Sequence, residues 1–255
     1  MFINNFDPVA FSLFSLEIRW YSLAYIFGIL IGWFYIKKFL LKDQNTNKDL
    51  DDLISYLIIG IIIGGRLGYV LFYNPNYYLN NLLEIFFLWK GGMSFHGGLI
   101  GVLVSTIIFS RKKNTNPFIF LDCISVAAPI GIFFGRISNF LNSELYGKET
   151  NVPWSVIFEK VDYVKRHPSQ IYEAFLEGLL LFLILNILIK KNFLNKKGFI
   201  SAVFLVLYSI FRFAAEYFRE PDAHLGYLIF NFSMGQILSI FLLAFGVAIF
   251  FKNEK

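Results

Sequence analysis

The chain is poor in the residues that disulfide-stabilised domains, metal sites and soluble surfaces require. It has one cysteine, so no disulfide or thiolate metal site can form within one chain, and Cys123, inside an apolar run, is read as a small packing residue. Its three histidines, His96, His167 and His224, are not spaced like metal ligands. Charged residues make up only 16% of the chain, against roughly 25% in soluble domains. We therefore expect no metal, no cofactor and no soluble domain.

Apolar residues are abundant instead. They make up 56% of the 255 residues, aromatic residues make up 20%, and the mean hydropathy is +0.58. Several apolar runs approach or exceed the roughly 20 residues that cross a bilayer as a helix. The net charge of +5 falls in short clusters between these runs, which does not favour a nucleic-acid partner. The composition predicts an all-α polytopic membrane protein.

The apolar runs predict about seven transmembrane helices. Residues 1–18 are expected to form an arm in the membrane interface, and 82–89 is too short to cross. Residues 1–10 lack the basic region of a secretory signal, so we expect Met1 to belong to the mature chain. With no repeat and no linker, residues 1–255 are interpreted as one transmembrane domain. The expected spans are approximately 20–40, 53–73, 94–109, 117–137, 170–189, 198–217 and 228–251.

Basic residues predict the orientation of these spans. Thirteen of the 23 lysines and arginines follow the first, third, fifth and seventh spans. By the positive-inside rule this side is cytoplasmic, which places the N-terminus outside and the C-terminus in the cytoplasm.

One sizeable segment, at about 143–169, is then expected outside. In it Trp154, Val156 and Phe158 alternate with Ser155 and Ile157, after the turn at 151–153. This pattern predicts a small strand or hairpin that forms an extracytoplasmic cap.

Unusual polar residues fall in the outer half of the predicted membrane layer. An ionised side chain in a membrane helix costs about 2.5–3.5 kcal/mol on insertion scales and usually marks function. The inner halves are almost uniformly apolar, so the sequence predicts a polar cavity in the outer half. The members of this layer are Tyr21, Arg66, His96, Arg136, Asn139, Glu144, Tyr208, Arg212, Glu216 and Arg219, the last four at helical spacings of four, four and three.

Simpler explanations remain open for single members of the layer. Arg136 could extend to the headgroups from a polar helix end. Arg212 and Glu216 could be a structural ion pair, and His96 could be a hydrogen-bonded packing residue. The glycines near these residues could serve close helix packing, which we expect in any case.

The layer suits the recognition of a phosphate. Guanidinium groups offer planar forks that match phosphate oxygens, and four arginines are available, at positions 66, 136, 212 and 219. The sequence shows no Ser-His-Asp arrangement and no phosphate-binding glycine loop. A phosphate-anchored lipid could instead be attacked by a second substrate, whose proton His96 could accept.

These motifs resemble the bacterial prolipoprotein diacylglyceryl transferase family over nearly the whole chain. The most specific match is Gly135 to Gly147, which contains Gly-Arg, Asn-Phe, Asn-x-Glu and a closing Gly. One departure is Ser138, where the family usually has Gly or Ala. Further matches are Gly91 to Gly101 around His96, Arg166 to Glu173, Phe211-Arg212, Glu216 to Asp222 and Ser233-Met234-Gly235-Gln236.

The resemblance implies transfer of the diacylglyceryl group of phosphatidylglycerol to the lipobox cysteine of a prolipoprotein. A thioether forms and glycerol phosphate leaves. Arg136 and Arg212 would stabilise the leaving phosphate, and His96 would deprotonate or orient the thiol; Cys123 would not be the nucleophile, because the thiol arrives on the substrate. Substrate-binding roles would fall to Arg136, Tyr21, Asn139, Glu144, Gly147, Tyr208, Glu216, Arg219 and Arg66.

The site would face the outer leaflet of a bacterial plasma (inner) membrane, where lipid and secreted peptide meet. A transporter or binding protein for anionic lipids is the alternative that uses the same arginines. A transporter usually has polar groups through the full membrane depth and repeated halves, which this sequence lacks. A structural scaffold would not need four arginines in one layer.

Overall fold

The computed structural model describes residues 2–14, 16–41, 43–221 and 226–253. The chain forms two compact units. The large unit contains residues 1–36 and 122–255, and the small unit contains residues 37–121. His224 and Asp222, named in the sequence patterns, lie outside the described residues.

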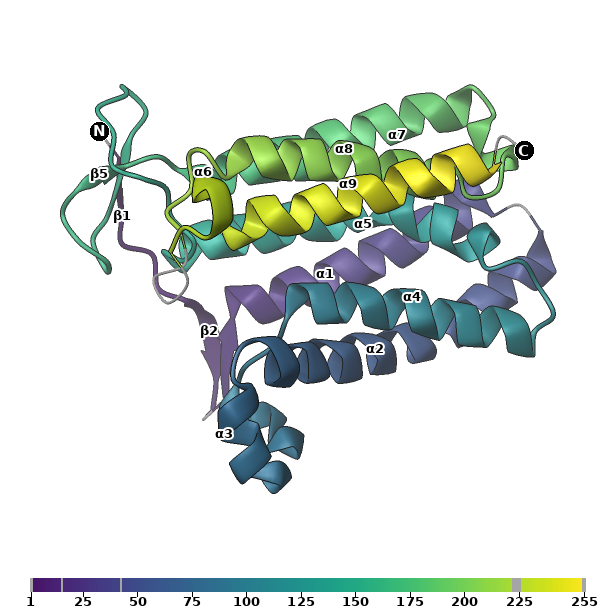
Figure 1. Cartoon of the computed structure of the whole chain (residues 1–255), viewed down its shortest axis with the longest axis horizontal. Coiled ribbons are helices and arrows are strands. Elements are labelled where there is room, and N and C mark those ends of the chain that lie inside the picture. Colours follow the sequence, from purple (N-terminus) through teal and green to yellow (C-terminus); the bar gives the residue numbers. More distant parts are fainter. Residues whose placement is uncertain (1, 15, 42, 222–225, 254–255) are drawn as a thin grey trace. The chain divides into compact units, whose positions relative to one another are not determined.

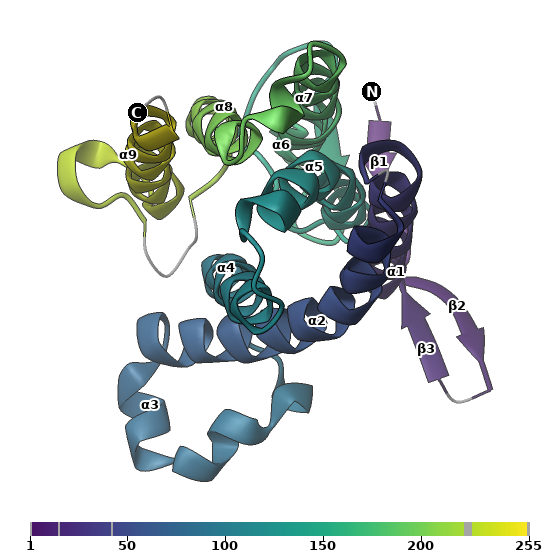
Figure 2. The same cartoon turned by 90° about the vertical axis from the view of Figure 1, so that its right-hand side faces the viewer.

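The large unit is a bundle of long apolar helices. Its members are α1 (Trp20–Tyr35), α5 (Phe118–Leu141, which begins in the small unit), α6 (Ser169–Glu173), α7 (Leu181–Lys190), α8 (Phe199–Ala215) and α9 (Met234–Asn253). A π-helical stretch, Ala174–Leu180, joins α6 to α7 into one continuous helix. α8 lies between α7 and α9 in both views (Figures 1 and 2).

Close helix packing in this bundle depends on small residues. A Cβ at Gly28 of α1 would lie 2.9 Å from the Cα of Gly131 in α5. A Cβ at Gly178, in the π-helical stretch, would lie 2.7 Å from the Cβ of Phe133 in α5. The backbones of α1 and of the π-helical stretch therefore approach α5 closely, which a larger side chain would prevent.

The small unit is built on α2 (Gln44–Phe72) and α4 (Phe95–Lys112), which run side by side (Figure 1). Glycines at 60, 64 and 68 of α2 meet glycines at 97 and 101 of α4, and a Cβ at Gly68 would lie 2.8 Å from the Cα of Gly97. The expected packing role of glycine is confirmed here. A π-helical turn (Ile36–Leu40) precedes α2. Between α2 and α4 the chain forms α3 (Pro75–Asn80) and 3₁₀ turns at Leu82–Phe86 and Leu88–Lys90.

Short strands accompany the helices, so the all-α prediction holds for most of the chain but not for all of it. β2 (Val9–Leu13) and β3 (Leu16–Arg19) form an antiparallel hairpin that leads into α1. β4 (Val156–Phe158) pairs with β5 (Lys165–Arg166) and with β1 (Phe2–Asn4) from the N-terminus. The hairpin expected near 154–158 is therefore present. Further 3₁₀ turns lie at Phe193–Asn195 and Ile229–Asn231.

The helices agree with the expected spans in part. Five described helical segments are long and apolar enough to cross a membrane, at Trp20–Leu40, Gln44–Phe72, Phe118–Leu141, Ser169–Lys190 and Met234–Lys252. α8 is apolar but shorter, and α4 coincides with the expected third span without being one of the five. The chain is thus a helical membrane protein, while the count of seven spans stays a prediction.

Candidate functional site

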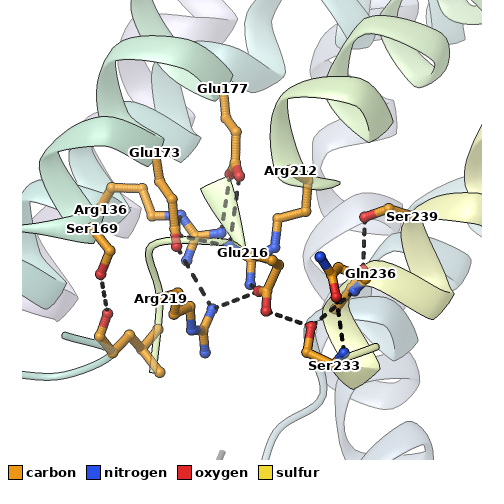
Figure 3. Close-up of polar contacts among 12 residues, drawn as sticks. Arg136, Ser169, Glu173, Glu177, Arg212, Glu216, Arg219, Ser233, Gln236 and Ser239 are labelled. Atoms are coloured by element: carbon orange, nitrogen blue, oxygen red, sulfur yellow. Dashed lines mark hydrogen bonds and ion pairs between the residues drawn. The ribbon is translucent and has the colours of Figure 1, made fainter. Parts of the chain in front are cut away.

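A cluster of six charged side chains lies inside the large unit (Figure 3). Arg136 comes from α5, while Glu173 ends α6 and Glu177 lies in the π-helical stretch. The other three, Arg212, Glu216 and Arg219, come from α8 and the turn after it. We call these six residues the charge cluster.

Glu173 is the centre of the charge cluster. Its Oε2 atom lies 2.9 Å from Nε of Arg136 and 2.9 Å from Nη1 of Arg212. One carboxylate oxygen therefore joins guanidinium groups from α5 and α8. Oε1 of the same residue lies 3.9 Å from Nη1 of Arg219.

The two other carboxylates complete the pairing. Nη2 of Arg136 donates a 3.1 Å hydrogen bond to Oε2 of Glu177, whose Oε1 lies 3.6 Å from Nη1 of Arg212. Glu216 accepts a hydrogen bond from Nη2 of Arg212 and lies 3.7 Å from Nη1 of Arg219. Arg136 and Arg219 thus contact two carboxylates each, and Arg212 contacts all three.

Burial differs between the two kinds of side chain. Glu173 and Glu177 are 0% exposed, whereas the side chains of Arg136, Arg212 and Arg219 are 15%, 11% and 8% exposed. Ions buried without partners would cost several kcal/mol each, so the mutual pairing is what makes the cluster tolerable. The side chains of the three arginines are thus partly open, whereas these two carboxylates are fully enclosed.

The start of α9 fixes Glu216. Oγ of Ser233 donates a 2.6 Å hydrogen bond to Oε2 of Glu216. Ser233 and Gln236 also form a reciprocal capping box, in which the backbone N–H of each residue donates to the side chain of the other, at 3.0 and 3.2 Å. A Cβ at Gly235 would lie 2.5 Å from Oε1 of Glu216. The Ser233-Met234-Gly235-Gln236 motif is therefore the contact between α9 and the charge cluster.

Arg219 is not on the helix, contrary to the expected stripe of four residues. α8 ends at Ala215, and Glu216 is its C-cap. Turn residues follow, because the backbone at Arg219 pairs with Gly147 in an antiparallel bridge. A side chain at Gly147 would collide with the backbone carbonyls of His167 and Phe218, so glycine is required there.

Asn139 and Glu144 lie together in the turn that closes α5. Nδ2 of Asn139 donates a 3.2 Å hydrogen bond to Oε2 of Glu144, and the backbone N–H of Glu144 donates to the carbonyl of Asn139 at 2.9 Å. The start of α6 holds this turn in place. Gln170 donates to the carbonyl of Glu144 at 2.6 Å, and Ser169 donates to that of Leu145 at 3.0 Å. The turn is thereby tied to the helix that carries Glu173.

The two predicted tyrosines differ in their surroundings. Tyr208 is buried on α8, one turn before Arg212, and stacks on Phe204 at 5.8 Å between ring centroids. Tyr21 is exposed at the start of α1 and packs edge-on against Tyr25 at 5.0 Å. Ser138, the departure from the family pattern, donates a 3.1 Å hydrogen bond to the carbonyl of Trp20 and so connects α5 to this end of α1.

Arg66 and His96 belong to the small unit. Arg66 is buried, and its guanidinium donates to the backbone carbonyls of five residues, namely Glu84, Ile85, Phe87, Gly91 and Gly92. Its donors are therefore used by the loop before α4. His96 lies in the first turn of α4, after the N-cap Ser94, and is partly buried.

The β4–β5 hairpin contains an ion pair. Nη2 of Arg166 lies 2.6 Å from Oδ2 of Asp162, and this hydrogen-bonded guanidinium holds the pKa of the Asp162 carboxyl below its usual value. Burial lowers the pKa of the neighbouring His167, whose ring packs on Phe218 at 5.3 Å. Neither group contacts the charge cluster.

Sequence reasoning missed the two central carboxylates as site residues. In the sequence Glu173 is only the last residue of the motif Arg166 to Glu173, and Glu177 lies in no motif. A signal was present, because two glutamates four residues apart in an otherwise apolar span are expensive unless they are paired. Within the described part of the chain no group of three or more His, Cys, Asp and Glu residues is arranged to hold a metal ion.

The fold defines a helical membrane protein whose large unit buries three guanidinium groups paired with three carboxylates. The family model for prolipoprotein diacylglyceryl transferase matches residues 8–252. Curated relatives from Rickettsia bellii and Rickettsia felis, both named phosphatidylglycerol–prolipoprotein diacylglyceryl transferase, are 49% identical, covering 100% and 96% of this chain and 98% and 96% of their own lengths. A relative of the same name from Rickettsia canadensis is 48% identical. The chain belongs to the prolipoprotein diacylglyceryl transferase family.

Proposed function

We propose that this enzyme transfers the diacylglyceryl group of phosphatidylglycerol to a cysteine thiol of a prolipoprotein, at the lipobox of its signal peptide. The observation that carries the proposal is the pairing of Arg136 and Arg212 through one oxygen of Glu173, 2.9 Å from each. Two guanidinium groups from different helices are thereby fixed with part of each side chain exposed. Such preorganised cations stabilise developing negative charge strongly in a site with little water.

The reaction is a displacement at a glycerol carbon. The thiol loses its proton, and its sulfur forms a bond to that carbon. The bond between the carbon and the phosphate oxygen breaks, and glycerol phosphate leaves with the bonding electron pair. The step therefore needs a proton acceptor for the thiol and cations for the phosphate.

Roles for individual residues follow from this chemistry. Arg136 and Arg212 bind and stabilise the phosphate, with Arg219 at the edge of the same cluster. His96 accepts or orients the thiol proton. Glu216 holds Arg212, while Tyr21, Tyr208, Asn139, Glu144 and Gly147 position the substrates or the turn beside them.

Arg66 takes a different role in this proposal from the one expected for it. Its guanidinium donates hydrogen bonds to five backbone carbonyls of the loop Glu84–Gly92, which precedes the helix of His96. Arg66 therefore stabilises the conformation of this loop. It supports the proposed catalytic histidine through the loop instead of binding phosphate itself.

The proposal places the whole chain, 1–255, in the bacterial plasma (inner) membrane as one domain with about seven spans. The N-terminus is outside, the C-terminus is cytoplasmic, and residues 143–169 form the outer cap. Support comes from the thirteen basic residues on the cytoplasmic side. The site then opens towards the outer leaflet, where a membrane lipid and a secreted peptide are both available.

The test supplies the purified protein, in lipid, with phosphatidylglycerol labelled in an acyl chain and a peptide that carries a lipobox cysteine. Label should appear on this peptide, and not on its Cys→Ser counterpart. Arg136→Ala should abolish the transfer. Arg111→Ala should not, because Arg111 is exposed and lies in the last turn of α4, at the opposite end of that helix from His96. Folded wild-type protein that transfers no label would overturn the transferase and leave a transporter or binding protein for anionic lipids, which flux assays would reveal.

A further inference from the structure

The charge cluster is electrically balanced. It contains three guanidinium groups and three carboxylates within hydrogen-bond or ion-pair distance of one another. We infer that Glu177 is a positioning residue that limits the affinity of the site for phosphate, because it cancels one of the positive charges that a bound phosphate would meet. This inference rests on the proposed function, and it concerns the release of the product.

The geometry places Glu177 behind the phosphate-binding groups. Its carboxylate is 0% exposed, whereas the side chain of Arg136 is 15% exposed and that of Arg212 is 11% exposed. The arginine side chains are therefore the part of the charge cluster that a ligand can approach, while Glu177 contacts them from full enclosure. Glu177 acts on the ligand only through Arg136 and Arg212 and through its own charge.

The charge of the ligand changes during the reaction. Phosphatidylglycerol carries a phosphodiester with one negative charge, and the leaving glycerol phosphate is a monoester with about −1.5 to −2 charges at pH 7. Three uncompensated guanidinium groups would hold this product more tightly than the lipid that precedes it. The three carboxylates reduce this difference in affinity between the product and the lipid, so the product can leave.

Glu177 is the carboxylate that can be neutralised with the least damage. Glu173 bridges two arginines through a single oxygen, 2.9 Å from each, and Glu216 is also tied to Ser233 of α9. Glu177 has longer contacts, of 3.1 Å to Arg136 and 3.6 Å to Arg212. A glutamine there keeps an amide oxygen that can accept the hydrogen bond of Arg136 while removing the charge.

The experiment measures the affinity of glycerol 1-phosphate for wild-type enzyme and for Glu177→Gln, both reconstituted in lipid, by calorimetry and by product inhibition. We expect glycerol 1-phosphate to bind about tenfold more tightly to Glu177→Gln, since one unit charge is removed a few ångströms from the ligand. Steady-state kcat should fall, because release becomes slow, while single-turnover transfer should change only a few-fold. A purely structural role would weaken binding instead.

Asp122→Asn provides the matched control. Asp122 is another buried carboxylate of the large unit, but it accepts hydrogen bonds from Gly198 and Ser201 instead of pairing with the charge cluster. Its neutralisation should lower stability and leave the affinity for glycerol 1-phosphate unchanged.

Glu177→Gln leaves three buried arginines with only two carboxylates, and this excess positive charge could impair folding. A second pair of variants, built on Arg219→Gln, avoids the excess. Arg219→Gln removes one positive charge, so adding Glu177→Gln to it restores neutrality. The double variant should bind glycerol 1-phosphate about tenfold more tightly than Arg219→Gln alone. Unchanged or weaker binding on addition of Glu177→Gln, in either background, overturns the inference. Wild-type protein that neither transfers label nor binds glycerol 1-phosphate overturns the proposed function itself.

Discussion

Gly235 and Glu216 approach each other so closely that a Cβ at Gly235 would lie 2.5 Å from Oε1 of the glutamate. This oxygen accepts the hydrogen bond of Arg212, so the smallest change at the start of α9 reaches the charge cluster directly.

Gly235→Ala should therefore displace Glu216 and release Arg212 from its rotamer. We expect transfer activity to fall at least tenfold, because a misplaced catalytic cation stabilises the leaving phosphate poorly. The assay is labelled-lipid transfer per folded molecule. Gly131→Ala is the control, since a Cβ there would meet its nearest neighbour, Gly28, at 3.9 Å, an ordinary contact. Equal activity of the two variants would contradict the role of Gly235.

Ser233→Ala should lower stability as well as activity. The hydroxyl caps α9 and also donates to Glu216. Loss of an N-cap costs about 1 kcal/mol, and the buried carboxylate oxygen left without its donor adds about 1–3 kcal/mol. Thermal unfolding in detergent measures the loss. Ser233→Thr keeps both hydrogen bonds and should restore most of the stability, and a Thr variant as weak as the Ala variant would show that packing matters more than the hydroxyl.

Arg66→Lys should loosen the loop between α3 and α4 although the charge is kept. An ammonium group has three donors and cannot serve five carbonyls in the plane of a guanidinium fork. Limited proteolysis should show faster cleavage within Glu84–Gly92. The affinity for glycerol 1-phosphate should be unchanged, and a large loss of that affinity would return Arg66 to the phosphate site.

Asp122→Ala should destabilise α8 from a distance. Asp122 lies on α5 but accepts hydrogen bonds from the backbone N–H groups of Gly198 and Ser201, at 2.6 and 2.8 Å, at the first turn of α8. Removing it leaves buried donors unsatisfied, at a cost of about 1–3 kcal/mol. Chemical unfolding should shift accordingly, while activity per folded molecule is retained. No shift would mean that water replaces the carboxylate at no cost.

The β4–β5 hairpin should lose stability in acid. The pKa of Asp162 is lowered in the folded protein by Arg166, so the unfolded chain binds the proton more readily. The stabilisation is thus fully present above the ordinary aspartate pKa of about 3.9 and is lost as the pH falls through the lower pKa of the folded state. Hydrogen exchange of residues 156–166 from pH 6 to pH 3 would follow the loss. Asp162→Asn should remove this dependence, and an identical acid profile in that variant would assign the transition elsewhere.

Much of the helical fold could be predicted, because apolar runs long enough to cross a membrane leave few alternatives to a helix. The runs near α5 and near the continuous helix from α6 to α7 gave the bounds of these helices to within a few residues. The end of α8 was predicted too late, since Glu216 and Arg219 continue the helical spacing. Their backbone instead turns to meet Gly147, a partner 72 residues earlier in the chain that no local pattern reveals.

The candidate site was predicted in part for a similar reason. Arg136, Arg212, Glu216 and Arg219 were expected together and do form one cluster. Arg66 was grouped with them because its type and predicted depth matched. Its actual partners are backbone carbonyls, which every residue possesses and which therefore leave no trace in the sequence.

The π-helical stretch Ala174–Leu180 gives this span a particular tolerance of chain length. It holds Glu177 and directly follows Glu173, and a π-turn contains about one residue more than an α-turn. Deleting one residue there would let the helix continue as a regular α-helix, and its two ends would keep nearly their present rotation relative to each other. The same deletion within the regular helix α7 would rotate the parts on either side of it by about 100°. The span that carries Glu173 and Glu177 therefore loses a residue with the least disturbance in the stretch that contains Glu177.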